Sequence, residues 1–402
     1  MGGLKPSQNS PLDEWLQWQE SLHSQVIDLE LSRVKKVYKI LFPNGAPFKV
    51  ITVAGTNGKG STIAFIDNIY QQSDYIVGKF TSPHITKYNE RFAINGENVD
   101  DNAICDVFNE IEHVRGNISL TYFEFSTLAA LLIFTRNSVD IAVMEIGLGG
   151  RLDSVNIVNP DVSVITNIDI DHVDYLGNTR ELIGHEKAGI MRPNVPCICG
   201  DTDPPNSLSE HARNIGTTIT FVSSPYKGEL KLPGDYQRTN AAVAIKAVES
   251  LQVAIPINEQ QISEGIKKTS LNGRFQIIKI KDKELILDVA HNVAAIKVLA
   301  KELEKDDIET LAIFSALKDK NIKSMISTIR PLIKEWFLVP INTERAISTK
   351  DLKSNFSFDD NVTALDSMSS AIDQAINSEK YQRVVVFGSF HTVTDAVKAL
   401  EI

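Results

Sequence analysis

The stretch "VITVAGTNGKGSTIAF", residues 50–65, joins an apolar run to a glycine-rich turn and a second apolar run. A buried strand, a glycine-rich turn and the start of a helix are together typical of a phosphate-binding loop. The usual loop reads G-x-x-x-x-G-K-[ST], but here Val53 stands where the first glycine belongs and Gly60 separates Lys59 from Ser61. The stretch therefore predicts a phosphate loop of altered spacing. The alternative is a glycine-rich turn that carries an exposed lysine.

The residue types of this turn suit an anion and its counter-ion. Glycines allow backbone N–H groups to point toward a phosphate, the helix dipole favours negative charge, and Lys59 adds a positive charge. Ser61 is placed to ligate Mg2+ and is also expected to cap the following helix with its hydroxyl group.

Around this turn the chain alternates short β-rich runs with helical patterns. Residues 12–42 carry apolar positions at helical spacing, and further strands are predicted at 75–80, 139–146 and 161–168. This rhythm predicts an α/β fold in which a mostly parallel sheet is covered by helices.

A second unit is predicted after a helical stretch at residues 237–251. The segment 267–278 resembles a linker, and strands are expected within 284–290, 311–316, 335–340 and 383–389, separated by helices. We therefore predict a domain at 1–271 that binds nucleotide and a smaller Rossmann-like α/β domain at 272–402.

Composition limits the classes of function. The 402 residues carry a formal charge of -10, with 43% hydrophobic and 23% charged residues, and a pI of about 5.4. These values suit a globular protein and argue against nucleic acid or an acidic membrane as a partner. Three cysteines predict reduced thiols, and no run approaches the ~20 apolar residues of a membrane span, so we expect a cytoplasmic protein.

Polar side chains follow several of the predicted strands, where ligands bind in open α/β sheets. Each has an ordinary alternative reading as a turn residue, a solvated acid, a helix cap or a surface lysine. In the first domain the candidates are Ser82, His84, Glu145, Asp169, Asp171, His172, Asp174 and Lys187; in the second they are Asp288, His291, Asn292, Ser389 and His391.

Nine motifs that occur in order along nearly the whole chain resemble the folylpolyglutamate synthase family of the Mur ligase superfamily. The motifs are "VAGTNGKGST", "TSPHITKYNERF", "LTYFEFSTLAALLIF", "MEIGLGGRLDSVNIV", "DHVDYLG", "HEKAGI", "GRFQII", "DVAHN" and "GSFHTV". The "GTNGKG" loop of this superfamily is a phosphate loop of the altered spacing seen here.

The resemblance implies an ATP-dependent amide ligase in which a substrate carboxylate is phosphorylated and the amine of L-glutamate then attacks the acyl phosphate. It further implies that Asn57, Gly58, Lys59 and Gly60 hold the ATP phosphates. By the same similarity, Asn240, Arg274 and Asp288 match nucleotide-binding positions.

The resemblance also implies two Mg2+ sites. Ser61, Ser82 and Glu145 would surround the first ion, and Glu145, His172 and Lys187 would hold the second. A cationic lysine cannot ligate a metal, and in this family the lysine is carbamylated by CO2. Lys59, His172 and Lys187 are therefore the expected catalytic residues.

Members with both dihydrofolate synthase and folylpolyglutamate synthase activity bind dihydropteroate through segments that are present here. The matching residues are Thr121, Tyr122, Phe123, Glu124, Leu152, Asp153 and Ser154. His291, Ser389 and His391 match positions near the incoming glutamate. The expected partners are dihydropteroate, tetrahydrofolates, L-glutamate and ATP, and we expect a monomer.

Three other readings remain open at this point. The chain could have folylpolyglutamate synthase activity alone, or it could be a nucleotide switch that hydrolyses ATP without ligation. A peptidoglycan ligase is disfavoured, because only residues 1–54 precede the loop, too few for the separate UDP-sugar domain of those enzymes.

Overall fold

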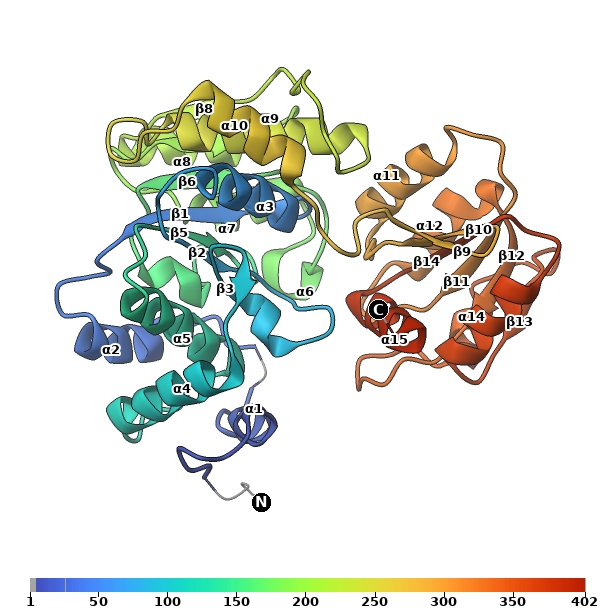
Figure 1. Ribbon diagram of the computed structural model, residues 1–402, viewed down its shortest axis with the longest axis horizontal. Coiled ribbons are helices and arrows are strands. Elements are labelled where there is room, and N and C mark those ends of the chain that lie inside the picture. The colour runs from blue at the N-terminus through green and yellow to red at the C-terminus, as the bar shows by residue number, and fades with distance from the viewer. Residues whose placement is uncertain (1–4, 26, 402) are drawn as a thin grey trace. The chain divides into compact units, whose positions relative to one another are not determined.

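The computed structural model describes residues 5–25 and 27–401, which form two compact units (Figure 1). Unit 1 comprises the described residues through His84, then Tyr88–Lys231 and Gln237–Thr269. Unit 2 comprises Ile85–Lys87, Leu232–Tyr236 and the chain from Ser270 onward. Two short segments of the chain thus belong to unit 2 before the chain enters it for good at Ser270. The single domain boundary predicted at 271 does not include these two segments.

Unit 1 is built on an eight-stranded sheet with the order β4-β3-β2-β5-β1-β6-β7-β8. The pairs from β2 to β8 are parallel, and β3 and β4 add an antiparallel edge. The strands are β1 (Lys49–Ala54), β2 (Val77–Phe80), β3 (Phe92–Ile94), β4 (Glu97–Asn98), β5 (Ile141–Glu145), β6 (Val162–Ile165), β7 (Cys197–Cys199) and β8 (Ile219–Phe221).

Helices cover both faces of this sheet. In Figure 1, α4 and α5 lie on one side of the strands, while α3 and α10 lie on the other. The helices of unit 1 are α1 (Leu12–Ser21), α2 (Ser32–Leu41), α3 (Lys59–Tyr70), η1 (Tyr88–Arg91), α4 (Asp101–Arg115), α5 (Tyr122–Arg136), η2 (Ser154–Ile157), α6 (Val173–Leu176), α7 (Arg180–Ala188), α8 (Asn206–Ile215), α9 (Asp235–Glu249, its first two residues in unit 2) and α10 (Glu259–Lys268).

Strand β1 lies inside the sheet because its sequence is apolar on both faces. Ile51 and Val53 on one face and Val50 and Ala54 on the other are all buried, as expected for a parallel strand covered by helices on both sides. Its register with β5 places Val53 opposite Glu145. The turn that follows β1 and the acid that ends β5 therefore emerge at the same edge of the sheet.

Unit 2 contains a six-stranded sheet with the order β13-β12-β11-β14-β10-β9, parallel except for β9. Its strands are β9 (Gln276–Ile280), β10 (Lys283–Leu287), β11 (Thr310–Phe314), β12 (Ile333–Leu338), β13 (Val362–Ala364) and β14 (Arg383–Phe387). Its helices are α11 (Val293–Leu303), α12 (Ile322–Ile329), η3 (Arg330–Leu332), α13 (Thr349–Lys353), α14 (Met368–Asn377) and α15 (Phe390–Leu400).

Alternate residues of the unit 2 strands build two separate cores. Ile286 and Val385 pack with α11 and α12, whereas Leu287 and Val386 pack with α14 and α15. This period of two is what a sheet buried on both faces requires. The predicted α/β class with a mostly parallel sheet in each half is confirmed, but the expected linker at 267–278 already contains the start of β9.

Two further features bear on the expectations drawn from composition. Cys105, Cys197 and Cys199 are buried and free of disulfides. In the part of the chain that the structure describes, no helix is long and apolar enough to span a bilayer.

We predict that Gln19→Leu stabilises the protein. Gln19 lies on α1 with 1% exposure, and neither atom of its amide has a hydrogen-bond partner among the described residues. A buried, unpaired polar group costs about 1–3 kcal/mol, so the leucine variant should raise the free energy of unfolding by roughly 1 kcal/mol or more. Urea titration would measure the gain. Gln17→Leu is the matched control, because Gln17 is exposed on the same helix; equal urea midpoints for the two variants would contradict the prediction.

Candidate active site

Two glycines, Gly55 and Gly58, shape the turn after β1. A larger residue at either position would force neighbouring atoms to move. A Cβ on Gly55 would lie 1.8 Å from Thr166 Oγ1, and a Cβ on Gly58 would lie 2.7 Å from Asn240 Oδ1. Gly58 also has a φ of 83°, in the left-handed region that favours glycine. Both positions therefore bring the backbone of the turn close to neighbouring polar groups.

The helix after the turn starts earlier than predicted. α3 begins at Lys59 with Gly58 as its N-cap, so the expectation that Ser61 caps the helix was wrong. The left-handed Gly58 turns the chain into the helix three residues before the expected cap and leaves Ser61 in the first helical turn. The Ser61 hydroxyl instead accepts a hydrogen bond from Gln237 Nε2 at 3.1 Å, and Asn240 Nδ2 donates to Gln237 Oε1 at 3.0 Å.

Lys59, Glu145 and Ser82 meet at the ends of three adjacent strands, β1, β5 and β2. Lys59 Nζ lies 3.9 Å from Glu145 Oε1 and donates to Gly55 O at 3.1 Å. The Ser82 backbone N–H donates to Glu145 Oε2 at 3.0 Å. Glu145 is 5% exposed, so this edge holds a buried carboxylate beside a lysine ammonium.

Lys187 on α7 is a buried lysine in a mixed electrostatic environment. Burial, together with the charge of Lys59, lowers the pKa of Lys187 from 10.5 to about 7, while Asp171 and Asp153 oppose the shift. A buried ammonium is unfavourable because it loses its hydration, so the neutral amine is stabilised. The structure therefore places a buried amine with a lowered pKa close to Lys59, Asp153 and Asp171.

Asp153 is buried in the turn after β5. Leu148 N donates to its Oδ2 at 2.8 Å and Val155 N to its Oδ1 at 2.9 Å. Burial raises the pKa of Asp153 to about 7, against the opposing effect of these backbone N–H groups and of Lys59. Its carboxyl group mainly holds the "GLGGRLDS" turn in shape.

His172 lies at the start of α6 in the left-handed conformation, with a φ of 50°. Its Nε2 is 4.0 Å from Asp171 Oδ2, and its side chain is about one-third exposed. A strained, partly exposed histidine in the loop between β6 and α6 remains accessible to a ligand.

The candidates for dihydropteroate binding surround the start of α5. Thr121 and Glu124 form a capping box, and Glu124 Oε1 also accepts a hydrogen bond from Arg33 at 3.2 Å, so both have structural partners. The Phe123 ring stacks on Phe80 with centroids 5.8 Å apart. The remaining members of this group are Tyr122, which is half-buried; Leu152, also half-buried; and Ser154, which is buried and shares a hydrogen bond with Thr127 at 2.6 Å.

The unit 2 candidates lie at the ends of the neighbouring strands β10 and β14. Asp288 accepts hydrogen bonds from Phe275 N and Ala290 N, each at 2.8 Å. Burial raises the pKa of Asp288, and the charge of Arg274 opposes that shift. The Arg274 guanidinium lies over the Phe390 ring at 5.3 Å.

The three expected glutamate positions differ in their surroundings. Ser389 caps α15 and accepts a hydrogen bond from Thr392 N at 3.0 Å, while His291 Nδ1 contacts Val289 O at 2.8 Å. His391 is exposed on the first turn of α15, and partial burial of its ring lowers its pKa. Of these three residues, only Ser389 caps a helix, which is the structural alternative to a role in glutamate binding.

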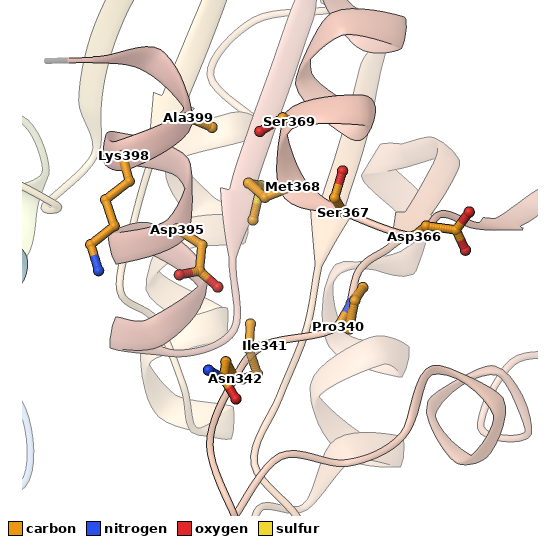
Figure 2. Close-up of a pocket in the computed structure, with 10 residues that line it drawn as sticks. All are labelled: Pro340, Ile341, Asn342, Asp366, Ser367, Met368, Ser369, Asp395, Lys398 and Ala399. Carbon is orange, nitrogen blue, oxygen red and sulfur yellow. The ribbon is translucent and has the colours of Figure 1, made fainter.

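Unit 2 also carries an open cavity of about 520 Å³ that none of the predicted residues lines (Figure 2). Asp395 and Lys398 of α15 face it from one side, and Ser367 and Met368 at the start of α14 face it from another. Its lining carries three charged residues of mixed sign, Asp366, Asp395 and Lys398, so it presents no concentrated field for an anion or a cation.

Among residues 5–25 and 27–401, no group of three or more His, Cys, Asp or Glu side chains is arranged to hold a metal ion. The predicted metal ligands include two serines and a lysine, which such a group would not contain. Sequence reasoning missed Gln237, whose signal was a pair of amides at i and i+3, Gln237 and Asn240, on an alanine-rich helix.

Comparison with known proteins places two matched regions on the two units. The Mur ligase middle domain matches residues 53–223, and the Mur ligase glutamate ligase domain matches residues 273–390. The dihydrofolate synthase/folylpolyglutamate synthase of Escherichia coli (strain K12) is 38% identical over 419 residues, with 98% of this chain and 97% of that protein covered.

Two solved structures resemble the whole chain. The E. coli FolC structure in complex with DHPP and ADP has a TM-score of 0.93 and 36% identity, with 99% of each chain covered. A bifunctional folylpolyglutamate synthase/dihydrofolate synthase with Mn, AMPPNP and L-glutamate bound has a TM-score of 0.90 and 35% identity, covering 99% of this chain and 100% of that one.

Proposed function

The chain belongs to the dihydrofolate synthase/folylpolyglutamate synthase family of ATP-dependent ligases, and we propose that it adds L-glutamate to dihydropteroate and further glutamates to reduced folates. The observation that carries this proposal is the convergence of Lys59, Glu145 and Ser82 at one sheet edge, directly after a glycine-rich loop. Such an edge can hold a nucleotide triphosphate and its cation.

The chemistry proceeds in two balanced steps. A carboxylate oxygen of the folate precursor attacks the γ-phosphorus of ATP, the bond to the β–γ bridging oxygen breaks, and ADP leaves. The neutral amine of glutamate then attacks the acyl carbon, the bond from carbon to phosphate oxygen breaks, and phosphate and a proton depart. An amide forms because phosphate is a far better leaving group than the oxide of a free carboxylate.

The protein's own contribution to the first step is electrostatic. The N–H groups in the first turn of α3 lack intrahelical partners, and Lys59 adds a unit charge at the same place. We assign Asn57, Gly58, Lys59, Gly60, Asn240, Arg274 and Asp288 to nucleotide binding. Gly58 lies beside Asn240, which links this loop to α9.

The residues present suit Mg2+. Serine hydroxyls and a carboxylate are the hard oxygen ligands that this ion prefers, and Gln237 fixes the orientation of the Ser61 hydroxyl. The 3.9 Å approach of Lys59 to the buried Glu145 shows that this carboxylate already attracts a cation. We assign Ser61, Ser82 and Glu145 to one ion, which when bound would neutralise phosphate charge.

For a second ion we propose Glu145, His172 and a carbamylated Lys187. Carbamylation requires a neutral amine, and burial provides one by lowering the pKa of Lys187 to about 7. The product carries an anionic oxygen pair at the end of the side chain. Its negative charge would lie near Lys59, which favours it.

The folate precursor and glutamate would bind at separate groups of residues. Tyr122 and Phe123 offer aromatic surface for a pterin, and Asp153 and Ser154 offer polar contacts beside it. His291, Ser389 and His391 of unit 2 are assigned to glutamate. We further propose a cytoplasmic monomer without nucleic-acid or membrane partners, in keeping with the charge of -10.

A direct assay tests the two activities. The purified chain should release ADP only when L-glutamate and either dihydropteroate or tetrahydrofolate are present together with ATP. Product on tetrahydrofolate alone would reduce the protein to folylpolyglutamate synthase. ADP release without glutamate or folate would favour a nucleotide switch.

A further inference from the structure

The phosphate loop is joined to a second loop that follows β6, residues 166–169. Thr56 N donates to Asn167 O at 3.0 Å, and Asn57 N donates to Asn167 Oδ1 at 2.8 Å. Thr166 Oγ1 donates to Asn57 O at 2.6 Å. These bonds fix the peptide groups of Thr56 and Asn57, immediately before Gly58.

The Thr56 hydroxyl adds two more hydrogen bonds between the loops, both to the backbone of Asp169. It donates to Asp169 O at 3.1 Å and accepts from Asp169 N at 3.0 Å, so one side chain satisfies both backbone groups of one residue. Asp169 lies three residues before His172. The same segment therefore borders the phosphate loop on one side and the His172 turn on the other.

Segment 166–169 is itself anchored at Ile168. Ile168 N donates to Asp201 Oδ2 at 2.7 Å, and Arg180 Nε donates to Ile168 O at 2.9 Å. Arg180 and Asp201 also form an ion pair at 3.0 Å, with Asp201 largely buried. A residue whose N–H and carbonyl are both held by the two partners of an ion pair has little freedom to move.

From these contacts we propose that Thr56 and Asn167 are positioning residues for nucleotide binding. They hold the peptide groups before Gly58 so that the N–H groups at the start of α3 face the phosphates before ATP arrives. The Asn57 N–H is used in this support, so the backbone amides left for phosphate are those from Gly58 onward. Affinity for nucleotide should then depend on side chains that never touch it, because a preordered site loses less freedom on binding.

The test compares Thr56→Val with Thr56→Ser. Valine keeps the shape but loses both hydrogen bonds to Asp169, whereas serine retains the hydroxyl. For Thr56→Val we expect the Kd for ADP with Mg2+, measured by calorimetry, and the KM for ATP to rise about tenfold, or ~1.4 kcal/mol. The KM for glutamate should stay within twofold, and Thr56→Ser should restore ADP affinity to within threefold.

Two further variants separate positioning from general stability. Asn167→Ala should weaken ADP binding as Thr56→Val does. Thr135→Val removes a hydroxyl bond to Leu131 O inside α5, at 2.8 Å, and should leave ADP binding unchanged. Wild-type ADP affinity in both Thr56→Val and Asn167→Ala would overturn the proposal, and Asn167→Ala decides alone if Thr56→Val does not fold. The inference rests on the proposed nucleotide site; failure of the wild-type chain to bind ADP would instead refute that site.

Discussion

Lys59→Ala is expected to abolish ligation while the protein stays folded. The side chain provides the unit positive charge at the phosphate loop, and loss of such a group from a preorganised site lowers turnover by about 10³-fold or more. Its contacts within the protein are few: the carbonyls of Gly55 and Thr56 and the more distant Glu145. The measurement is kcat for ADP release with dihydropteroate and glutamate, beside a thermal unfolding curve.

Lys49→Ala provides the control for Lys59→Ala. Lys49 starts strand β1, which precedes the loop, is partly exposed and pairs with Asp161 at 2.8 Å, so its removal should leave turnover near wild type. Near-normal turnover in Lys59→Ala would contradict the assignment of this turn as a phosphate loop. Inactivity that comes with a collapsed unfolding curve would point to a structural role for Lys59 instead.

Lys187→Ala is expected to lose at least about 10²-fold in turnover, comparable to the loss of a metal-site partner. If Lys187 acts as a carbamate, Lys187→Arg should be equally inactive, because arginine keeps the positive charge but cannot take up CO2. Wild-type protein prepared with ¹³C-bicarbonate should show a carbamate carbon signal that is absent from both variants.

Chemical rescue provides a further test of the predicted carbamate on Lys187. Lys187→Ala leaves a buried space, and a small carboxylate such as acetate could supply the missing negative charge there. Recovery of turnover with acetate in Lys187→Ala, but not in Lys187→Arg, is the expected pattern. Substantial activity in Lys187→Arg would show that a cation suffices and would refute the carbamate.

Much of the fold was accessible from local patterns. The apolar runs around 50–54, 141–145 and 162–165 are strands, and their carboxyl ends share one edge of the sheet. The predicted start of α3 was wrong because a glycine in the left-handed conformation, and not a serine side chain, caps the helix. The pattern of apolar residues is the same for either kind of cap. The roles of the site residues remain predictions, to be decided by the experiments above.

The sequence by itself determined the class of the fold and the family, and it predicts a phosphate loop at "GTNGKG", because strand periodicity and this motif are local properties of the chain. Only the tertiary structure decided which partners those residues meet. Gln237 reaches Ser61 across 176 positions, Asn167 holds Asn57 across 110, and burial lowers the pKa of Lys187 to about 7. Such contacts follow from strand order and helix packing, and burial changes the chemistry of a side chain whose identity stays the same.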